Sequence, residues 1–148
     1  MYYGGMTSKG YHHVYDAHYH VVFPVKYRKA LLRDDITKAI KEIAQALAEH
    51  YECEMEEIGC DNDHIHLLCS FAPTYSGGQF VRLFKSITAK KLFEQFPDLR
   101  KELWGGEFWS DGYYLATVGK RGSWDIVQNY VKNQGTGNTD ITNQLRLL

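Results

Sequence analysis

The sequence predicts an α+β fold, a ferredoxin-like (RRM-like) sandwich with the element order β-α-β-β-α-β-α. Two short alternating stretches, 53–60 and 64–71, flank the turn residues 61–63 and predict a hairpin. Apolar residues at helical spacing lie before and after this hairpin, and a strand pattern lies beyond each of them. In a split unit of this order, strands one and three are central neighbours in an antiparallel sheet. Both helices cover one face, which leaves the other face open for an active site.

The first half of the chain supplies the first strand and the first helix. Residues 14–23 are rich in Tyr, Val and His and end at Pro24, which indicates a strand. Asp34 or Asp35 is expected to cap a helix that apolar spacing extends to about residue 50.

After the hairpin, the second half supplies the remaining elements. Apolar residues from Phe80 to Leu92 predict a second helix, and residues 113–118 predict the last strand. Ser123 is expected to cap a third helix that ends at about Gln134, before Gly135.

Composition is that of one ordinary globular domain spanning residues 1–148, with an irregular arm at 1–11 and a polar tail at 136–148. The formal net charge of −1 excludes a globally basic protein, so any nucleic acid would bind through local patches. No apolar run approaches the ~20 residues of a membrane span, and there is no signal pattern at the N-terminus. Three cysteines without Cys-x-x-Cys spacing disfavour disulfides and fit a reducing cytoplasm.

A pair of histidines on one strand face is the main candidate for chemistry. Alternation along 64–71 turns Ile65 and Leu67 toward the helices and sets His64 and His66 side by side on the open face. A His-x-His pair alone is a weak signal, and a structural pair is the alternative. Imidazoles with oxygen ligands and open positions suit Mg²⁺, Mn²⁺ or a similar divalent ion.

Two groups of neighbours would support such a metal. The carboxylates of Asp61 and Asp63 are placed to orient an imidazole from behind. His20, on the first strand, would lie beside the metal if strands one and three are neighbours, or would be an ordinary surface histidine.

Tyr130 and Gln134 are four residues apart, so they share one face of the third helix. Gln134 would add an amide oxygen to the metal, and Asn133 is a substitute one helical step away. The Tyr130 hydroxyl would then attack a phosphate made electrophilic by the metal. The alternative is that Tyr130 packs at the edge of the apolar stripe and Gln134 is solvated.

The chain resembles the single-tyrosine HUH transposases of small bacterial insertion sequences and their palindrome-associated relatives. The matching segments are Tyr19–Lys29, Asp63–Leu68, Leu103–Gly106, Trp109–Tyr114 and Thr117–Gly119, followed by Val127, Tyr130, Val131 and Gln134. The resemblance implies that His64, His66 and Gln134 bind the metal and that Tyr130 attacks DNA. It also implies a homodimer whose active sites combine the tyrosine of one subunit with the histidines of the other, in a prokaryotic, nucleoid-associated protein.

Basic residues in two places are candidates for DNA contacts. Lys26, Arg28 and Lys29 form a cluster beside the expected active site, with a solvated surface run as the alternative. Arg82, Lys85, Lys90 and Lys91 lie away from the apolar stripe of the second helix. That pattern alone describes a soluble face, and the resemblance implies a DNA-hairpin contact there.

The expected function is a transposase that cleaves and rejoins single-stranded DNA with hairpin ends through a 5′-phosphotyrosine. One alternative is a replication or conjugation nickase of the same chemistry. Another is a non-catalytic RRM-like binding module, which the histidines on strand three disfavour because they replace the RNA-recognition signature. Trp104, Phe108 and Trp109 would either stack unpaired bases or pack in the core.

Overall fold

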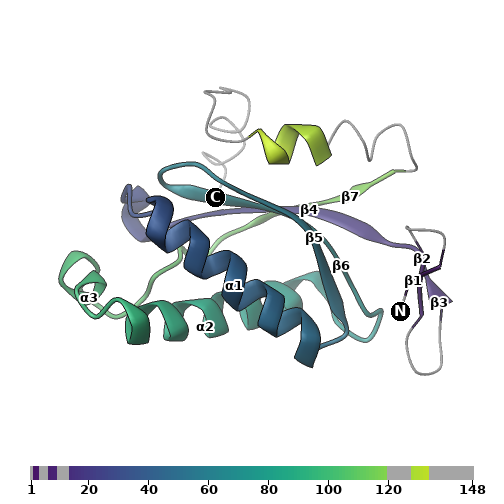
Figure 1. Ribbon diagram of the computed structural model, residues 1–148, viewed down its shortest axis with the longest axis horizontal. Coiled ribbons are helices and arrows are strands. Elements are labelled where there is room, and N and C mark those ends of the chain that lie inside the picture. Colours follow the sequence, from purple (N-terminus) through teal and green to yellow (C-terminus); the bar gives the residue numbers. More distant parts are fainter. Residues whose placement is uncertain (1, 4–6, 10–13, 120–127, 134–148) are drawn as a thin grey trace.

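The computed structural model describes residues 2–3, 7–9, 14–119 and 128–133, and places a four-stranded sheet against two long helices (Figure 1). The elements are β1 (Tyr2–Tyr3), β2 (Thr7–Lys9), β3 (Val14–Tyr15), β4 (His18–Pro24), η1 (Lys26–Arg28), α1 (Asp34–His50), β5 (Cys53–Cys60), β6 (His64–Phe71), α2 (Gly77–Gln95), α3 (Leu99–Glu102) and β7 (Tyr114–Val118). Residues 128–132 are also helical.

The large sheet has the strand order β5-β6-β4-β7, and every neighbouring pair is antiparallel. The first and third strands of the split unit, β4 and β6, are the central neighbours, as the sequence predicted. Their register pairs Val22 with His66 and Pro24 with His64. This pairing fixes which side chains of β4 stand beside the two histidines.

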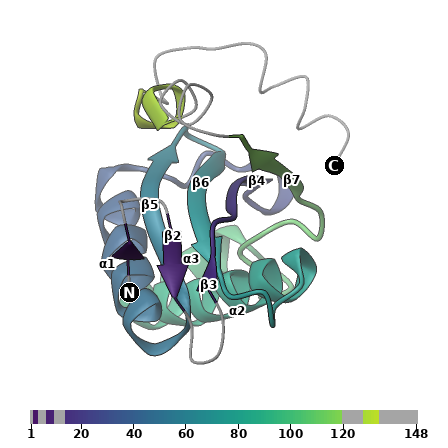
Figure 2. The ribbon, with the colours of Figure 1, turned by 90° about the vertical axis from the view of Figure 1, so that its right-hand side faces the viewer.

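Both long helices lie on one face of the sheet, whereas the helical segment 128–132 lies on the other (Figures 1 and 2). Alternation along β6 turns Ile65, Leu67, Cys69 and Phe71 into the core beneath α1 and α2. The two histidines of β6 consequently belong to the opposite face, as predicted. Within the described residues, no helix has both the length and the apolar character needed to cross a bilayer.

The helix ends differ in detail from the sequence prediction. The N-cap of α1 is Arg33, while Asp34 and Asp35 occupy the first turn, where a carboxylate is favourable beside the exposed backbone N–H groups. Helix α2 begins earlier than its apolar pattern, because Ser76 and Gln79 form a capping box. The third helix is described only from 128 onward, so its predicted start at Ser123 lies outside the described residues.

The predicted first strand and N-terminal arm were wrong in part. Residues 14–23 do not form one strand, since the chain breaks between β3 and β4 at Asp16 and Ala17. The arm is not wholly irregular, because β1 and β2 pair with each other and β2 pairs with β3 in a small antiparallel sheet. The predicted tail at 136–148 lies outside the described residues.

Strand β5 is the outer strand of the large sheet and carries an irregularity. Its register against β6 shifts at Glu56, because Met55 faces Cys69 and Glu57 faces the next residue, Leu68. A bulge of this kind strengthens the local twist and bends the strand.

Candidate active site

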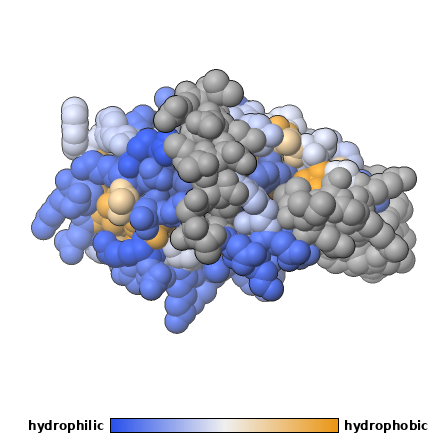
Figure 3. Space-filling view, turned by 90° about the horizontal axis from the view of Figure 1, so that it is seen from above, coloured by the Kyte–Doolittle hydropathy of each residue, from blue (hydrophilic) through white to orange (hydrophobic). Residues whose placement is uncertain are grey.

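The candidate site is built around the two histidines of β6. The rings of His64 and His66 lie 5.0 Å apart between centroids. Exposure is 4% for His64 and 0% for His66, so both imidazoles are shielded from solvent. Seen from the side of the sheet that carries residues 128–133, the described surface is mostly hydrophilic (Figure 3).

A carboxylate orients the first of these histidines. Asp63 Oδ1 lies 2.8 Å from His64 Nδ1, and Arg28 Nε donates to Asp63 Oδ2 at 3.1 Å. Burial acts to raise the pKa of Asp63, but the hydrogen bonds from His64 and Arg28 outweigh it, and the pKa is lowered overall. An ionised Asp63 accepts a hydrogen bond from Nδ1–H of His64, which favours the tautomer with the lone pair on Nε2. The other candidate carboxylate, Asp61, places its Oδ2 4.0 Å from that Nε2 atom.

A third histidine orients the second. His20 Nε2 lies 3.0 Å from His66 Nδ1, and their rings are stacked with centroids 5.3 Å apart. Burial lowers the pKa of His20 to about 4. Burial, with the nearby His20 and His64, lowers the pKa of His66 to about 2. Both rings are therefore neutral at pH 7, the form in which imidazole binds a metal.

The two outward nitrogens are the chemically available atoms. The Nε2 atoms of His64 and His66 are buried and make no hydrogen bond in the described part of the chain. A buried polar atom without a partner is costly unless a ligand or water satisfies it. Imidazole nitrogens with a carboxylate nearby fit a divalent metal. Among the described residues no group of three or more His, Cys, Asp or Glu is arranged to hold one, and Gln134 lies outside them.

Tyr130, on the helical segment 128–132, contacts the histidine cluster on the open face of the sheet. Its ring lies edge-on to His66 at 6.1 Å and to His20 at 6.5 Å. It is half-buried and packs with Tyr114 against Val22 on the same sheet face. The neighbouring Val131 is fully buried. One chain thus brings the candidate nucleophile to its own histidines.

The basic cluster after β4 has acidic partners. Lys26 Nζ lies 2.8 Å from Glu107, and Lys29 Nζ lies 3.7 Å from Glu102. The hydrogen bond to Glu107 is the main reason that the pKa of Lys26 is raised. Together with the Arg28–Asp63 pair, every cation of this cluster is paired in the structure. Their predicted phosphate contacts stay predictions, and the structure adds a structural role for each.

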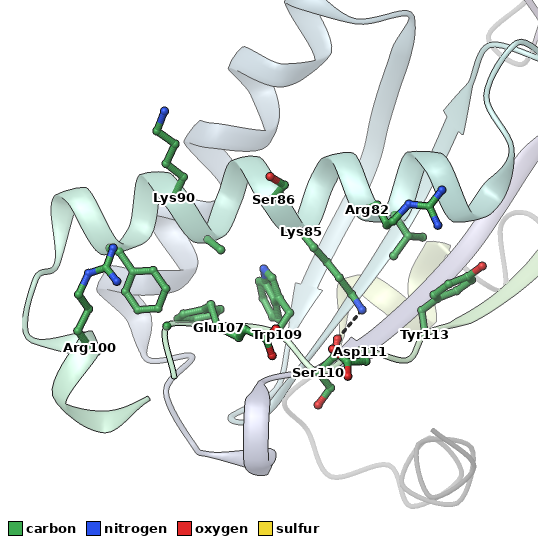
Figure 4. Close-up of a pocket in the computed structure, with 15 residues that line it drawn as sticks. Arg82, Lys85, Ser86, Lys90, Arg100, Glu107, Trp109, Ser110, Asp111 and Tyr113 are labelled. Carbon is green, nitrogen blue, oxygen red and sulfur yellow. Dashed lines mark hydrogen bonds between the residues drawn. The ribbon is translucent and has the colours of Figure 1, made fainter. Parts of the chain in front are cut away.

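The basic residues of α2 divide into two kinds. Arg82, Lys90 and Lys91 are exposed. Lys85 is half-buried, and its ammonium donates to the backbone carbonyl of Ser110 at 2.5 Å (Figure 4). It also donates to the backbone carbonyl of Gly112 at 2.8 Å. Burial lowers the pKa of Lys85 to about 8. Its predicted DNA contact stays untested, but its main described contacts tether the segment that leads into β7.

A groove of ≈ 580 Å³ lies along the face of α2 that carries Lys85 (Figure 4). Arg82, Lys85, Lys90 and Arg100 contribute cations to its lining, while Glu107 and Asp111 contribute carboxylates. The guanidinium of Arg100 lies 4.5 Å over the ring of Phe93. Sequence reasoning missed Arg100, because the short helix α3 that carries it has no periodic pattern to reveal it.

Comparison with known protein families covers most of the chain. A family model described as "Transposase IS200 like" matches residues 13–134. The ISDra2 transposase TnpA of Deinococcus radiodurans is 32% identical over 127 residues, which covers 86% of this chain and 90% of that protein. The transposase of insertion sequence element IS200 from Salmonella typhimurium is 35% identical over 123 residues, covering 83% of this chain and 80% of the relative.

Solved structures agree with the sequence matches. A crystal structure assigned as a transposase from Deinococcus radiodurans R1 superposes with a TM-score of 0.68 at 30% identity, over 88% of this chain and 99% of that one. A REP-associated tyrosine transposase bound to a REP hairpin has the same fold, with a TM-score of 0.56 at 9% identity over 85% and 70% of the two chains.

These matches define the class: the protein is a transposase, an enzyme that cuts and rejoins DNA. The chain belongs to the IS200-like transposase family.

Proposed function

We propose that this transposase cleaves and rejoins single-stranded DNA through a covalent bond between Tyr130 and a 5′ phosphate. The observation that carries the proposal is the Tyr130 ring 6.1 Å from the His66 ring, on the sheet face to which both histidines belong. A nucleophile, two imidazoles and an ionised carboxylate therefore meet at one place.

We propose Mg²⁺ or Mn²⁺ as the cofactor, held through Nε2 of His64 and of His66. Gln134 is the proposed amide ligand, with Asn133 as its substitute, and Asp61 is a further oxygen donor near His64. When bound, the ion polarises the scissile phosphate and stabilises the charge that develops on it. Asp63 and His20 hold the two imidazoles in the orientation and tautomer that present Nε2.

Cleavage and rejoining of the strand need no nucleotide cofactor. The Tyr130 hydroxyl loses its proton and its oxygen bonds to phosphorus, while the bond from phosphorus to the 3′ oxygen breaks and that oxygen leaves as a 3′-OH. In the second step, another 3′-OH attacks the same phosphorus and the tyrosine leaves. The energy of the first phosphodiester is kept in the tyrosine ester until the strand is resealed.

We also propose hairpin-bearing strands as the DNA substrate. The REP-associated transposase, which shares this fold, is bound to a REP hairpin. In this chain, exposed Arg82, Lys90 and Lys91 on α2 provide cations on the helix side of the sheet. Phosphates of a hairpin stem would displace counterions there, which favours binding at low salt.

The decisive experiment is adduct formation. Wild-type protein incubated with single-stranded DNA carrying family-type hairpin ends, with Mn²⁺, should give a protein–DNA species that survives denaturant. Tyr130→Phe keeps the ring that packs on Val22 but removes the attacking oxygen, so the adduct should disappear while DNA binding persists. Tyr114→Phe removes the hydroxyl from the neighbouring ring and is the matched control. Undiminished adduct in Tyr130→Phe would disprove the assignment.

A further inference from the structure

An exposed pair of aromatic rings stands outside the functions assigned so far. Tyr27 is 55% exposed and Trp104 is 79% exposed, yet their rings are nearly parallel, 22° apart, with centroids separated by 6.4 Å. Phe108 and Trp109, on the same connection as Trp104, are buried. The protein thus buries two aromatics of this connection and displays the third beside a tyrosine.

The backbone adopts unusual conformations at Tyr27 and next to Trp104. Tyr27 and Arg28 have φ values of 60° and 53°, a region that residues other than glycine rarely adopt. Gly105 and Gly106, which follow Trp104, have φ values of 104° and 80°. Glycine adopts such φ values freely, whereas the unfavourable backbone at Tyr27 and Arg28 persists where the surroundings enforce it and is typical of functional sites.

Two salt bridges and one backbone hydrogen bond hold the two segments together. Salt bridges Lys26–Glu107 and Lys29–Glu102 each join the Tyr27 segment to the Trp104 segment. The backbone N–H of Lys26 donates to the carbonyl of Phe108 at 2.8 Å. The ring pair is therefore fixed by residues other than its own two members.

The pair is also coupled to the candidate active site. Arg28, the residue after Tyr27, donates to Asp63, and Asp63 contacts the ring of His64. The backbone N–H of Val25 donates to the Asp63 carbonyl at 2.8 Å. The aromatic pair therefore lies near His64, because Arg28 and Asp63 link Tyr27 to the ring of this proposed metal ligand.

We propose that Tyr27 and Trp104 form a stacking platform for an unpaired base of the DNA strand that enters the active site, an inference that rests on the proposed function. Every base has a flat face that stacks on an aromatic ring, and only an unpaired base offers that face to a protein. The neighbouring lysines are already paired with glutamates, so this surface suits the base rather than the phosphate. The platform would position the strand beside His64 without reading its sequence.

Binding to two probes of equal charge tests the platform. We would measure the affinity of Tyr130→Phe protein, which cannot react, for an oligonucleotide of about 20 deoxyadenosines and for one of equal length with abasic sugars. The platform predicts tighter binding of the deoxyadenosine probe. Trp104→Ala should weaken that binding by about tenfold and leave binding of the abasic probe unchanged. Trp104→Phe, which keeps a flat ring, should retain most of the affinity.

The salt dependence separates stacking from charge. Because stacking releases no counterions, Trp104→Ala should lower the affinity without changing the slope of its logarithm against the logarithm of salt concentration. Tyr51→Ala is the control, since Tyr51 is an exposed tyrosine at the end of α1, in the helix layer. Equal affinity of the parent protein for the two probes would overturn the platform, and so would unchanged binding by both Trp104→Ala and Tyr27→Ala.

The covalent assay keeps the two proposals distinguishable. If wild-type protein forms the Tyr130 adduct but Trp104→Ala binds both probes as its parent does, the platform fails and the proposed function stands. If no adduct forms but base-dependent binding requires Trp104, the platform stands and the proposed chemistry fails.

Discussion

Tyr130 and His66 of one chain face each other edge to face, with ring centroids 6.1 Å apart and planes 77° apart. Tyr130 packs against Val22, which is paired with His66 across β4 and β6 and offers an apolar surface for the tyrosine ring. A single subunit can therefore assemble the nucleophile with its own histidines.

The homodimer with shared sites stays a prediction, and a mixing experiment separates it from the site within one chain. A His64→Ala/His66→Ala subunit is combined with a Tyr130→Phe subunit, and heterodimer formation is checked by mass. The described geometry predicts a dead mixture, because every chain lacks a part of its own site. Recovered cleavage would show instead that the segment carrying Tyr130 crosses to the partner, as the family resemblance implies.

The Asp63–His64 contact should set metal affinity. Asp63→Asn keeps the size of the side chain but loses the charge that fixes the His64 tautomer, so Mn²⁺ affinity should fall about 10–100-fold. Titration calorimetry with Mn²⁺ measures this directly, and His64→Ala should bind more weakly still. Asp35→Asn, which alters an exposed aspartate on α1, is the control.

Cleavage by wild type should stop in chelator and return with Mg²⁺ or Mn²⁺, whereas full activity in chelator would contradict metal assistance.

Charge reversal on α2 should weaken hairpin binding. In Lys90→Glu/Lys91→Glu, two exposed cations on the helix surface become anions, so the buried core is untouched and the fold should be kept. Affinity for a hairpin-bearing strand should drop, and the salt slope should fall by about one for each DNA phosphate that these lysines neutralise in the wild type. Lys38→Glu/Lys41→Glu, which reverses two exposed lysines of α1, is the matched control. An equal drop in affinity for both variants would point to net charge rather than a local interaction.

Lys85 should make stability depend on pH above neutrality. Its pKa is lowered from 10.5 to about 8 in the folded protein, so between these values the unfolded chain binds more protons than the folded one. The free energy of unfolding should then rise with pH across this window. Lys85→Met removes the titrating group, so wild type should gain stability relative to Lys85→Met between pH 8 and 10.5 in urea unfolding. A constant difference between the two proteins would exclude this linkage.

The hairpin of β5 and β6 and the side on which its histidines lie were predictable from the sequence. Alternation over 53–60 and 64–71 has a local cause, the pleat of a β-strand, and the observed bounds are the predicted ones. The position of Gln134 as a metal ligand stays a prediction, because that residue lies outside the described part of the chain.

The contacts that refine the site could not be predicted, because they join distant segments. Arg28 and Asp63 are 35 residues apart, and no local pattern distinguishes an arginine that binds a carboxylate from one that binds phosphate. The left-handed conformation of Tyr27 is likewise imposed by tertiary contacts and contradicts the ordinary preference of a tyrosine. The capping box of α2 was visible as Ser76 and Gln79, and the prediction overlooked it.

The irregular outer strand β5 has a consequence for how these molecules coexist at high concentration. A flat edge with unpaired backbone groups is a template for another chain's strand and a route to fibrous aggregates. Here the bulge at Met55–Glu57 bends that edge, and the strand carries the carboxylates of Glu54 and Glu57. Two copies approaching along β5 would meet mismatched registers and like charges. The strand thus completes the sheet of its own molecule and disfavours its extension by another.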